Sequence, residues 1–116
     1  MAALLAKAVS GDASAVPAHT ALRMATLNGA KALGLESEIG SLEAGKWADI
    51  TAVRLDRIET QPLFNPVSDL VYAASRHQVS DVWVGGRRLL RNRELTTLDI
   101  GDISHKARLW REKLLH

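Results

Sequence analysis

The sequence of 116 residues contains no cysteine, and this absence excludes disulfide bonds and metal sites built on thiolates. It also agrees with a reducing cytoplasm, where we expect the protein to reside. Only five residues are aromatic, namely one Phe, one Tyr and three Trp. A core must therefore be built from Ala, Leu, Val and Ile, and a hydrophobic content of 47% is sufficient for one small domain.

The chain also has little net charge and no long apolar run. Fifteen basic and thirteen acidic residues leave a net charge of +2, which gives no electrostatic argument for a polyanionic partner. Apolar runs such as residues 1–6 are far too short to cross a bilayer. Residues 1–7 lack the basic leading segment of a secretory signal. We therefore expect neither a nucleic acid nor a membrane as a partner.

The N-terminal third of the chain predicts two helices. Residues 2–9 are rich in Ala and Leu and are followed by Ser10 and Gly11, which stop the first helix. Pro17 suits the first turn of a second helix. Gly34 suits the left-handed position after that helix, with Leu35 as its apolar partner. One side of the second helix has small residues that would allow close approach of another backbone, namely Ala21, Ala25, Gly29 and Ala32.

The middle of the chain predicts a hairpin followed by a loop. Residues 39–42 and 48–55 have the pattern of two strands joined by a turn at 43–46. Two prolines, Pro62 and Pro66, then mark a loop. Residues 67–75 fit a short helix or a strand, and we favour the helix.

The C-terminal part predicts a second hairpin and a last helix. Residues 80–84 and 87–91 are predicted as the two strands of a hairpin around Gly85 and Gly86, which supply the positive φ angles of a tight turn. Asp99 is suited to cap the last helix. That helix is amphipathic, with apolar residues at positions 100, 103, 107, 110 and 114. The whole pattern is typical of an α+β fold with a small antiparallel sheet.

Four stretches of the sequence carry a resemblance to a known family. They are residues 25–30 (Ala-Thr-Leu-Asn-Gly-Ala), 40–49 (Gly-Ser-Leu-Glu-Ala-Gly-Lys-Trp-Ala-Asp), 65–74 and 79–87. In this order they resemble the C-terminal end of metal-dependent amidohydrolases. The last two narrow the resemblance to the deaminase and chlorohydrolase branch, and the likeness is greatest to 5-methylthioadenosine/S-adenosylhomocysteine deaminases. The similarity extends over residues 2–115.

This resemblance implies a division of the chain into three segments. Residues 1–35 correspond to the last helices of a (β/α)8 barrel. Residues 36–95 correspond to the C-terminal part of a β-sandwich that both ends of the family's polypeptide assemble, and residues 96–116 to a closing C-terminal helix. We expect these segments to form one compact unit. Met1 would lie within a helix of the complete enzyme, so we expect a truncated reading frame or an excised piece.

The resemblance also implies a reaction whose metal ligands this chain lacks. The family replaces an exocyclic amine with hydroxide, using zinc or another divalent metal to activate water. The four histidines, His19, His77, His105 and His116, form no His-x-His, His-x-x-x-His or His-x-Glu pattern. We therefore assign no catalytic, cofactor-binding or metal-binding residue to this chain. We expect it to bind no small-molecule substrate by itself.

Other polar and aromatic candidates also have structural interpretations. Asp49 could act as a ligand or base, but we favour a carboxylate that accepts hydrogen bonds from the neighbouring turn. Asn28 is expected to satisfy local backbone groups. Four arginines could grip phosphate, but alternation sends them to different faces without interleaved aromatic residues; they are Arg87, Arg88, Arg91 and Arg93. The three tryptophans could stack on a purine, but core or interface roles are favoured; they are Trp47, Trp83 and Trp110.

Two hypotheses about function follow from the sequence. The first is a C-terminal segment of a deaminating amidohydrolase that is inactive alone. The second is a stand-alone oligomerisation or interaction module derived from that enzyme, because exposed apolar faces and open sheet edges promote association. On either hypothesis we expect a homo-oligomer.

Overall fold

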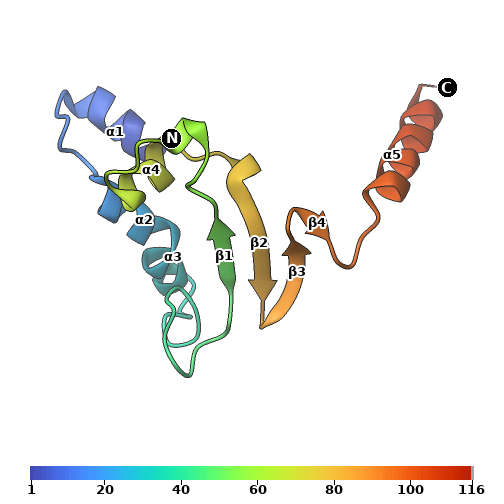
Figure 1. Cartoon of the computed structure of the whole chain (residues 1–116), viewed down its shortest axis with the longest axis horizontal. Helices are drawn as coiled ribbons and strands as arrows, with labels where there is room; N and C mark the ends of the chain where they lie inside the picture. The colour runs from blue at the N-terminus through green and yellow to red at the C-terminus, as the bar shows by residue number, and fades with distance from the viewer. Residues whose placement is uncertain (116) are drawn as a thin grey trace.

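A computed structural model describes residues 1–115 of the chain, so His116 lies outside the described residues. Figure 1 shows helices α1–α4 gathered beside a sheet, with α5 standing apart beyond β4. In chain order the elements are α1 (Ala2–Ser10), α2 (Ala18–Ala25), α3 (Leu27–Ala32), β1 (Ile50–Val53), η1 (Ile58–Thr60), α4 (Pro66–Tyr72), η2 (Arg76–Gln78), β2 (Val79–Val84), β3 (Arg87–Arg91), β4 (Glu94–Leu95) and α5 (Ile100–Leu114).

The second predicted helix is two helices, so the prediction of one continuous helix was wrong. Thr26 separates α2 from α3 with φ −125° and ψ −96°, outside the helical region. Its hydroxyl donates to the carbonyl of Leu22 at 2.8 Å, and its N–H donates to the carbonyl of Arg23 at 3.3 Å. A threonine hydroxyl bonded back to the preceding turn competes with the regular backbone ladder, and here the ladder breaks.

The end of this helical region matches the prediction. Gly34 has φ +70°, and its N–H donates to the carbonyl of Lys31 at 3.1 Å. The N–H of Leu35 donates to the carbonyl of Ala30 at 2.9 Å. This pair of bonds satisfies carbonyls at the end of α3 in the manner of a Schellman motif.

The sheet has four antiparallel strands in the order β1-β2-β3-β4. The predicted hairpin of β2 and β3 is confirmed, with Gly85 at φ +55° and Gly86 at φ +77° in its turn. The sequence analysis did not predict β4, which follows a second tight turn at Asn92 and Arg93, both with positive φ. Strand β1 forms one edge of the sheet and β4 the other.

The other predicted hairpin, between residues 39–42 and 48–55, was wrong. Residues 39–42 form no strand, and β1 pairs instead with β2, with Ile50 opposite Trp83. The segment before β1 is a loop, in which the N–H of Trp47 donates to the carbonyl of Glu38 at 2.8 Å. The Lys46 ammonium donates to the Ser41 hydroxyl at 2.7 Å and fixes the same loop. A non-local strand, β2, therefore replaces the sequence neighbour as the partner of β1.

Helix α4 confirms that the segment predicted at 67–75 is helical rather than extended, although the helix ends at Tyr72. The side chain of Asn65 accepts hydrogen bonds from the N–H groups of Val67 and Ser68, at 3.0 and 3.1 Å. Pro66 then occupies the first turn, where its missing N–H costs nothing. An Asn cap followed by Pro is a strong local signal for a helix start.

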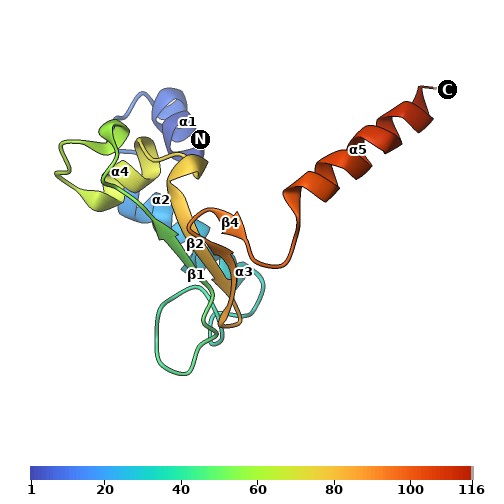
Figure 2. The same cartoon turned by 45° about the vertical axis from the view of Figure 1, so that its right-hand side comes forward.

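Helix α5 begins as predicted but stands away from the rest of the chain (Figure 2). The Asp99 carboxylate accepts from the N–H of Asp102 at 3.1 Å. All described residues from 91 onward are exposed, including Trp110 at 64%. The helix therefore closes no core within residues 1–115.

The core is small for a chain of this length. Only three apolar side chains in the described part are buried, Ala3, Ala18 and Ala30. The radius of gyration is 18.1 Å, whereas a compact chain of this length has about 13 Å. The accessible surface is 8962 Å², against about 6,200 Å² for a compact monomer of the same mass. Within residues 1–115, no helix combines the length and apolar character needed to cross a membrane.

Candidate functional site

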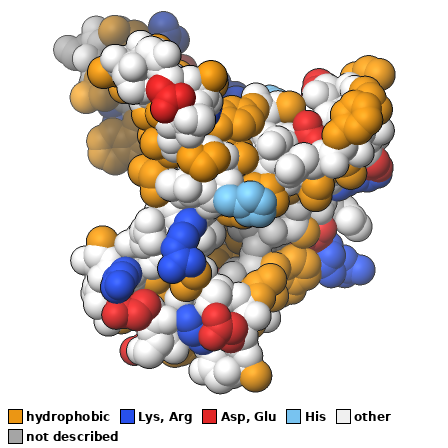
Figure 3. Space-filling view, turned by 90° about the vertical axis from the view of Figure 1, so that its left-hand side faces the viewer, with side chains coloured by type: hydrophobic (Ala, Val, Ile, Leu, Met, Phe, Trp, Pro, Cys, Tyr) orange, Lys and Arg blue, Asp and Glu red, His pale blue; other side chains and the backbone are white. Residues whose placement is uncertain are grey.

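A broad groove lies between the N-terminal helices and strand β1, and it is here called the helix–β1 groove. It has a volume of about 1140 Å³ and is lined by segments of α1, α2, α3, the loop at 39–42, β1 and α4. Among its described lining residues, only Asp49 has a charged side chain. Figure 3 shows the helical side of the molecule, where apolar side chains spread over the exposed surface. The groove is thus suited to apolar side chains rather than to a polar substrate.

Small side chains form the helical wall of this groove. Three of the four residues of the predicted small-residue face line it, namely Ala21, Ala25 and Gly29, whereas Ala32 does not. The break at Thr26 also divides that face between two helices. Ile50 also lines the groove and belongs to β1, which has no strand on its outer side within the described residues. The groove therefore combines an open sheet edge with a helix surface that permits close approach.

Asp49 lines the groove, and its carboxylate accepts a backbone hydrogen bond, but from a distant turn and not from the turn at 43–46 that precedes it in the sequence. Its Oδ1 accepts a hydrogen bond from the N–H of Gly85 at 2.6 Å. Gly85 lies in the turn between β2 and β3, and the ring of Trp47 packs against that turn, 3.3 Å from where a Cβ of residue 85 would lie. The carboxylate thus fixes the start of β1 to the hairpin.

The three histidines within residues 1–115 do not converge on a metal site. His19 lies in α2, His77 in η2 and His105 in α5, and all three are exposed. Across residues 1–115, no group of three His, Cys, Asp or Glu residues is placed so that it could hold a metal ion. A catalytic zinc needs three protein ligands within bonding distance of one point. The residues present therefore do not fit the family's metal, and no catalytic step is assigned to them.

The four arginines of the hairpin do not act together either. Arg88 donates through Nε and Nη2 to Oδ1 of Asp81. Arg93 donates through Nη1 to the carbonyls of Arg76, His77 and Val79 at 3.1, 2.8 and 2.9 Å. Arg87 and Arg91 are exposed at the ends of β3. Two of the four guanidinium groups, those of Arg88 and Arg93, are thus already hydrogen-bonded within the chain.

Asp81 is a buried carboxylate that the sequence analysis did not single out. Its Oδ1 also accepts from the N–H of Asn92 at 3.1 Å, and only 8% of the residue is exposed. The hydrogen bond from Arg88, then those from Ser80 and the Asn92 backbone, lowers the pKa of Asp81 to about 2. An acidic residue diagonal to an arginine on neighbouring strands of the predicted hairpin was the signal that could have revealed this pair.

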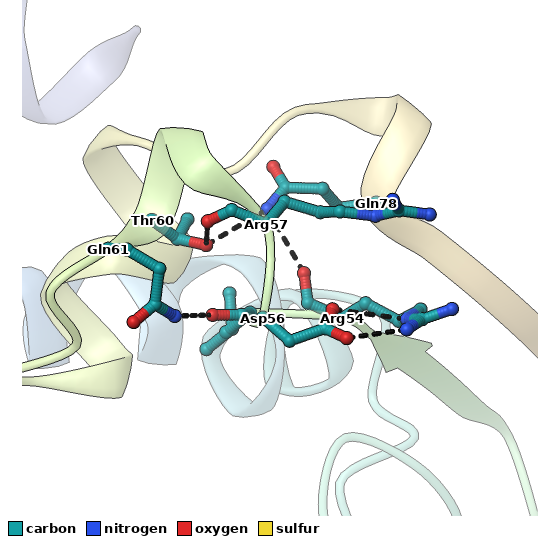
Figure 4. A network of polar contacts seen from close by, with 7 residues as sticks. Arg54, Asp56, Arg57, Thr60, Gln61 and Gln78 are labelled. Atoms are coloured by element: carbon teal, nitrogen blue, oxygen red, sulfur yellow. Dashed lines mark hydrogen bonds and ion pairs between the residues drawn. The ribbon is translucent and has the colours of Figure 1, made fainter.

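A second polar network was also missed (Figure 4). The side chain of Gln78 is only 5% exposed and donates to the carbonyl of Arg54 at 3.0 Å and to the hydroxyl of Thr60 at 3.2 Å. Its Oε1 accepts from the N–H of Ser75 at 2.8 Å. Beside this network, Arg54 and Asp56 form an exposed ion pair. A hydrogen bond from Arg54 lowers the pKa of Asp56 below its usual value.

The remaining aromatic and amide candidates have mixed placements. Trp47 is 59% exposed and its Nε1 donates to a carboxylate oxygen of Glu38 at 3.2 Å. The Arg88 guanidinium lies 5.1 Å from the centre of the Trp83 ring. Asn28 is exposed in the first turn of α3, and its backbone role stays a prediction.

Comparison with known proteins decides the family. The sequence pattern of the amidohydrolase family matches residues 1–89. The chain belongs to the amidohydrolase family. A 5-methylthioadenosine/S-adenosylhomocysteine deaminase from Teredinibacter turnerae is 54% identical over 113 residues, which are 97% of this chain and 26% of that protein. The deaminase of the same name from Moorella thermoacetica is 52% identical over 102 residues, 88% of this chain and 24% of that protein.

Solved structures of amidohydrolases have the same arrangement. A zinc-bound adenosine deaminase from Xanthomonas campestris superposes with a TM-score of 0.93 and 53% identity over 97% of this chain and 26% of its own. An atrazine chlorohydrolase from Arthrobacter aurescens, also complexed with zinc, superposes with a TM-score of 0.75 and 30% identity over 82% of this chain and 21% of its own. This amidohydrolase chain thus spans about a quarter of the length of its relatives.

Proposed function

We propose that this chain is the C-terminal segment of a deaminating amidohydrolase. It completes an enzyme whose metal ligands belong to the part of the enzyme outside this chain. The observation that carries this proposal is the match to a zinc-bound adenosine deaminase, with a TM-score of 0.93 over 97% of this chain but only 26% of the other. The parent enzyme acts on adenosine derivatives such as methylthioadenosine or S-adenosylhomocysteine. It works in the cytoplasm, a location that the cysteine-free sequence supports.

The three predicted segments have a natural place in such an enzyme. Residues 1–35 supply the last helices of the barrel, residues 36–95 supply one part of a composite sandwich, and residues 96–116 supply the C-terminal helix. The order of the elements supports this division, because α1–α3 precede all four strands and α5 follows them. The sparse core supports it too, because each segment exposes apolar side chains that a larger assembly would cover.

The isolated chain is inactive because it cannot assemble the metal centre. A divalent metal supplies a nucleophilic hydroxide near neutral pH when it is bound. The described histidines are exposed on separate elements, and Asp49 and Asp81 already accept hydrogen bonds within the fold. The contribution of this chain is therefore structural, through the elements that border the rest of the enzyme.

Ammonia release tests the proposal directly. The purified chain with added zinc should release no ammonia from methylthioadenosine or S-adenosylhomocysteine. A hybrid in which this chain replaces the matching 26% of the Xanthomonas campestris adenosine deaminase should release ammonia. Turnover by the isolated chain would disprove its inactivity, and a folded but inactive hybrid would disprove its role in completing the enzyme.

A second function, a stand-alone homo-oligomerisation module, is favoured by helix α5. Its apolar residues are exposed, with Ile100 at 59% and Leu114 at 80%, and no other part of residues 1–115 covers them. Pairing of two α5 helices would bury these side chains. Sedimentation at tens of micromolar should then show a dimer or larger species, and a Trp110→Glu variant should shift it to monomer. A monomer of the unmodified chain would exclude this function.

A further inference from the structure

Helix α5 carries a narrow apolar stripe that nothing in the described part of the chain covers. The apolar residues of this stripe recur at alternating spacings of three and four, at positions 100, 103, 107, 110 and 114. All five are exposed. A stripe confined to this repeat is typical of a helix that packs on another protein surface, whereas a helix that lies on a membrane needs a large apolar face.

The separation of α5 from the sheet is also found in a solved amidohydrolase. Both views of the molecule show α5 standing apart beyond an exposed linker, residues 96–99 (Figures 1 and 2). The Xanthomonas campestris adenosine deaminase matches 97% of this chain with a TM-score of 0.93, and this match must include most of the 15 residues of α5. The separation is therefore part of the fold, and the stripe must find its cover outside residues 1–95 of the same chain.

The charges beside the stripe are basic. Helix α5 contains four basic and two acidic residues. Arg111 borders one side of the stripe, and Lys106 and Lys113 border the other. Two paired α5 helices would place Lys106 against Arg111 in a parallel arrangement, or lysine against lysine in an antiparallel one. An acidic surface is therefore a better partner for α5 than a second α5.

The loop before β1, residues 35–47, has acidic side chains on its surface. It contains three glutamates and one lysine. The three glutamates are exposed; they are Glu36, Glu38 and Glu43. The ammonium of Lys46 instead points into the loop, where it donates to the Glu36 carbonyl at 2.6 Å and to the Ser41 hydroxyl at 2.7 Å, and only 12% of this side chain is exposed. The outer surface of the loop is therefore negative.

The same loop also exposes apolar side chains. Leu35 is 37% exposed and Trp47 is 59% exposed. Glu38 ties the two ends of the loop together, because its N–H donates to the Leu35 carbonyl at 2.9 Å and its carbonyl accepts from the Trp47 N–H at 2.8 Å. The loop thus offers apolar contacts beside carboxylates, the complement of an apolar stripe with basic flanks.

We propose that α5 of one copy docks on residues 35–47 of a second copy, with its stripe against Leu35 and Trp47 and its basic flanks toward the three glutamates. This inference rests on the homo-oligomerisation function proposed above and names the surface that receives α5. Because each copy has one α5 and one such loop, a two-fold dimer makes the contact twice.

Charge reversal on each side of the contact tests the inference with the full chain. Sedimentation equilibrium measures the dissociation constant of the dimer. Arg111→Glu changes the helix and Glu36→Lys changes the loop. Either variant alone brings like charges together at both contacts of the dimer, so the dissociation constant should rise at least about fivefold. An equimolar mixture of the two variants restores opposite charges at both contacts and should associate within about twofold of the unmodified chain.

Arg108→Glu and Glu59→Lys are the matched controls. Arg108 lies in α5 but away from the stripe. Glu59 is exposed in η1, beyond the other end of β1. Each control makes the same change in charge as its test variant, and its dissociation constant should stay within about twofold of the unmodified chain. Circular dichroism of the four variants checks that the secondary structure is retained.

A dimer that Arg111→Glu weakens but Glu36→Lys leaves unchanged would overturn the docking site and leave homo-oligomerisation in place. A mixture that associates no more tightly than either variant alone would also overturn the docking site. A monomeric unmodified chain would overturn homo-oligomerisation itself. A monomer whose tryptophan fluorescence shifts to shorter wavelength only with vesicles of anionic phospholipid would overturn the inference in favour of a membrane-binding helix. Ammonia release by the single-chain hybrid tests the role in a deaminase separately from all of these results.

Discussion

The side chain of Gln78 joins three segments of the chain, and we predict that Gln78→Leu removes a large part of the folding stability. The amide donates to the Arg54 carbonyl and the Thr60 hydroxyl and accepts from the Ser75 N–H, at 2.8–3.2 Å. Thr60 is only 2% exposed. Leucine has a similar volume, so the substitution removes the hydrogen bonds without creating a large cavity.

The magnitude follows from the groups that lose a partner. A buried polar group left without a hydrogen bond costs about 1–3 kcal/mol. The Thr60 hydroxyl keeps its bond to the Arg57 carbonyl at 3.1 Å, so most of the cost falls on the Arg54 carbonyl and the Ser75 N–H. Both groups belong to exposed residues and their bonds to Gln78 are part-buried, so each loss lies near the lower end of that range and the free energy of unfolding should fall by about 2 kcal/mol. That is a large share of the 5–15 kcal/mol typical of a domain.

Urea unfolding at pH 7, followed by tryptophan fluorescence and circular dichroism, measures this change. Gln61→Leu is the matched control, since Gln61 donates to the Leu55 carbonyl at 2.8 Å in an exposed position of the same region. Its loss should cost less than about 1 kcal/mol, because water replaces the lost partner. Equal unfolding midpoints for the two variants would refute the reasoning that burial of the Gln78 network, rather than the number of hydrogen bonds, sets the cost.

Three further predictions concern single positions. The pKa of Asp81 is lowered from 3.8 to about 2, so its contribution to stability is present above pH 4 and is lost as the pH falls toward 2; urea unfolding across this range should show the loss in the unmodified chain and a flatter profile in Asp81→Asn. Gly85→Ala should lower the free energy of unfolding by about 1–3 kcal/mol, because φ is +55° and a Cβ would lie 3.3 Å from the Trp47 ring. In the same assay Gly11→Ala, at φ +66° with open space around it, should lower it by only about 1–2 kcal/mol. Asp99→Ala removes the cap of α5 and should destabilise that helix by about 0.5–2 kcal/mol. The rate of amide hydrogen exchange in α5 should rise while the midpoint of global unfolding stays fixed. A lowered midpoint would show that α5 unfolds together with residues 1–99.

Local signals in the sequence predicted the features that depend on neighbours in the chain. The αL position of Gly34, the Gly85–Gly86 turn and the Asp99 cap are each set within a few residues, and all three are confirmed. The amidohydrolase resemblance is also confirmed. Turn and cap chemistry is largely independent of the tertiary fold, which explains these successes.

Features that depend on distant partners were not predictable in the same way. The strand expected at residues 39–42 is a loop because β1 takes its hydrogen bonds from β2, about thirty residues later in the sequence. The helix breaks at Thr26, where the hydroxyl donates to the Leu22 carbonyl and the N–H donates to the Arg23 carbonyl. The sequence does not show that Thr26 forms these bonds in place of the regular helical ones. The helix–β1 groove is lined by six segments of the chain. Its presence depends on how these segments pack together, which no local sequence pattern predicts.

The same distinction explains why the chain has so many polar networks and so little core. The bonds of Asp81, Gln78 and Arg93 fix the sheet to its turns, and all of their partners lie within this chain. The apolar side chains of the groove and of α5 have no comparable cover among residues 1–115. Polar networks need their partners at short range because an unpaired buried group is costly, whereas apolar burial can be supplied by any surface of suitable shape. A partner that binds only the folded form would therefore add its binding free energy to a fold whose geometry is already set.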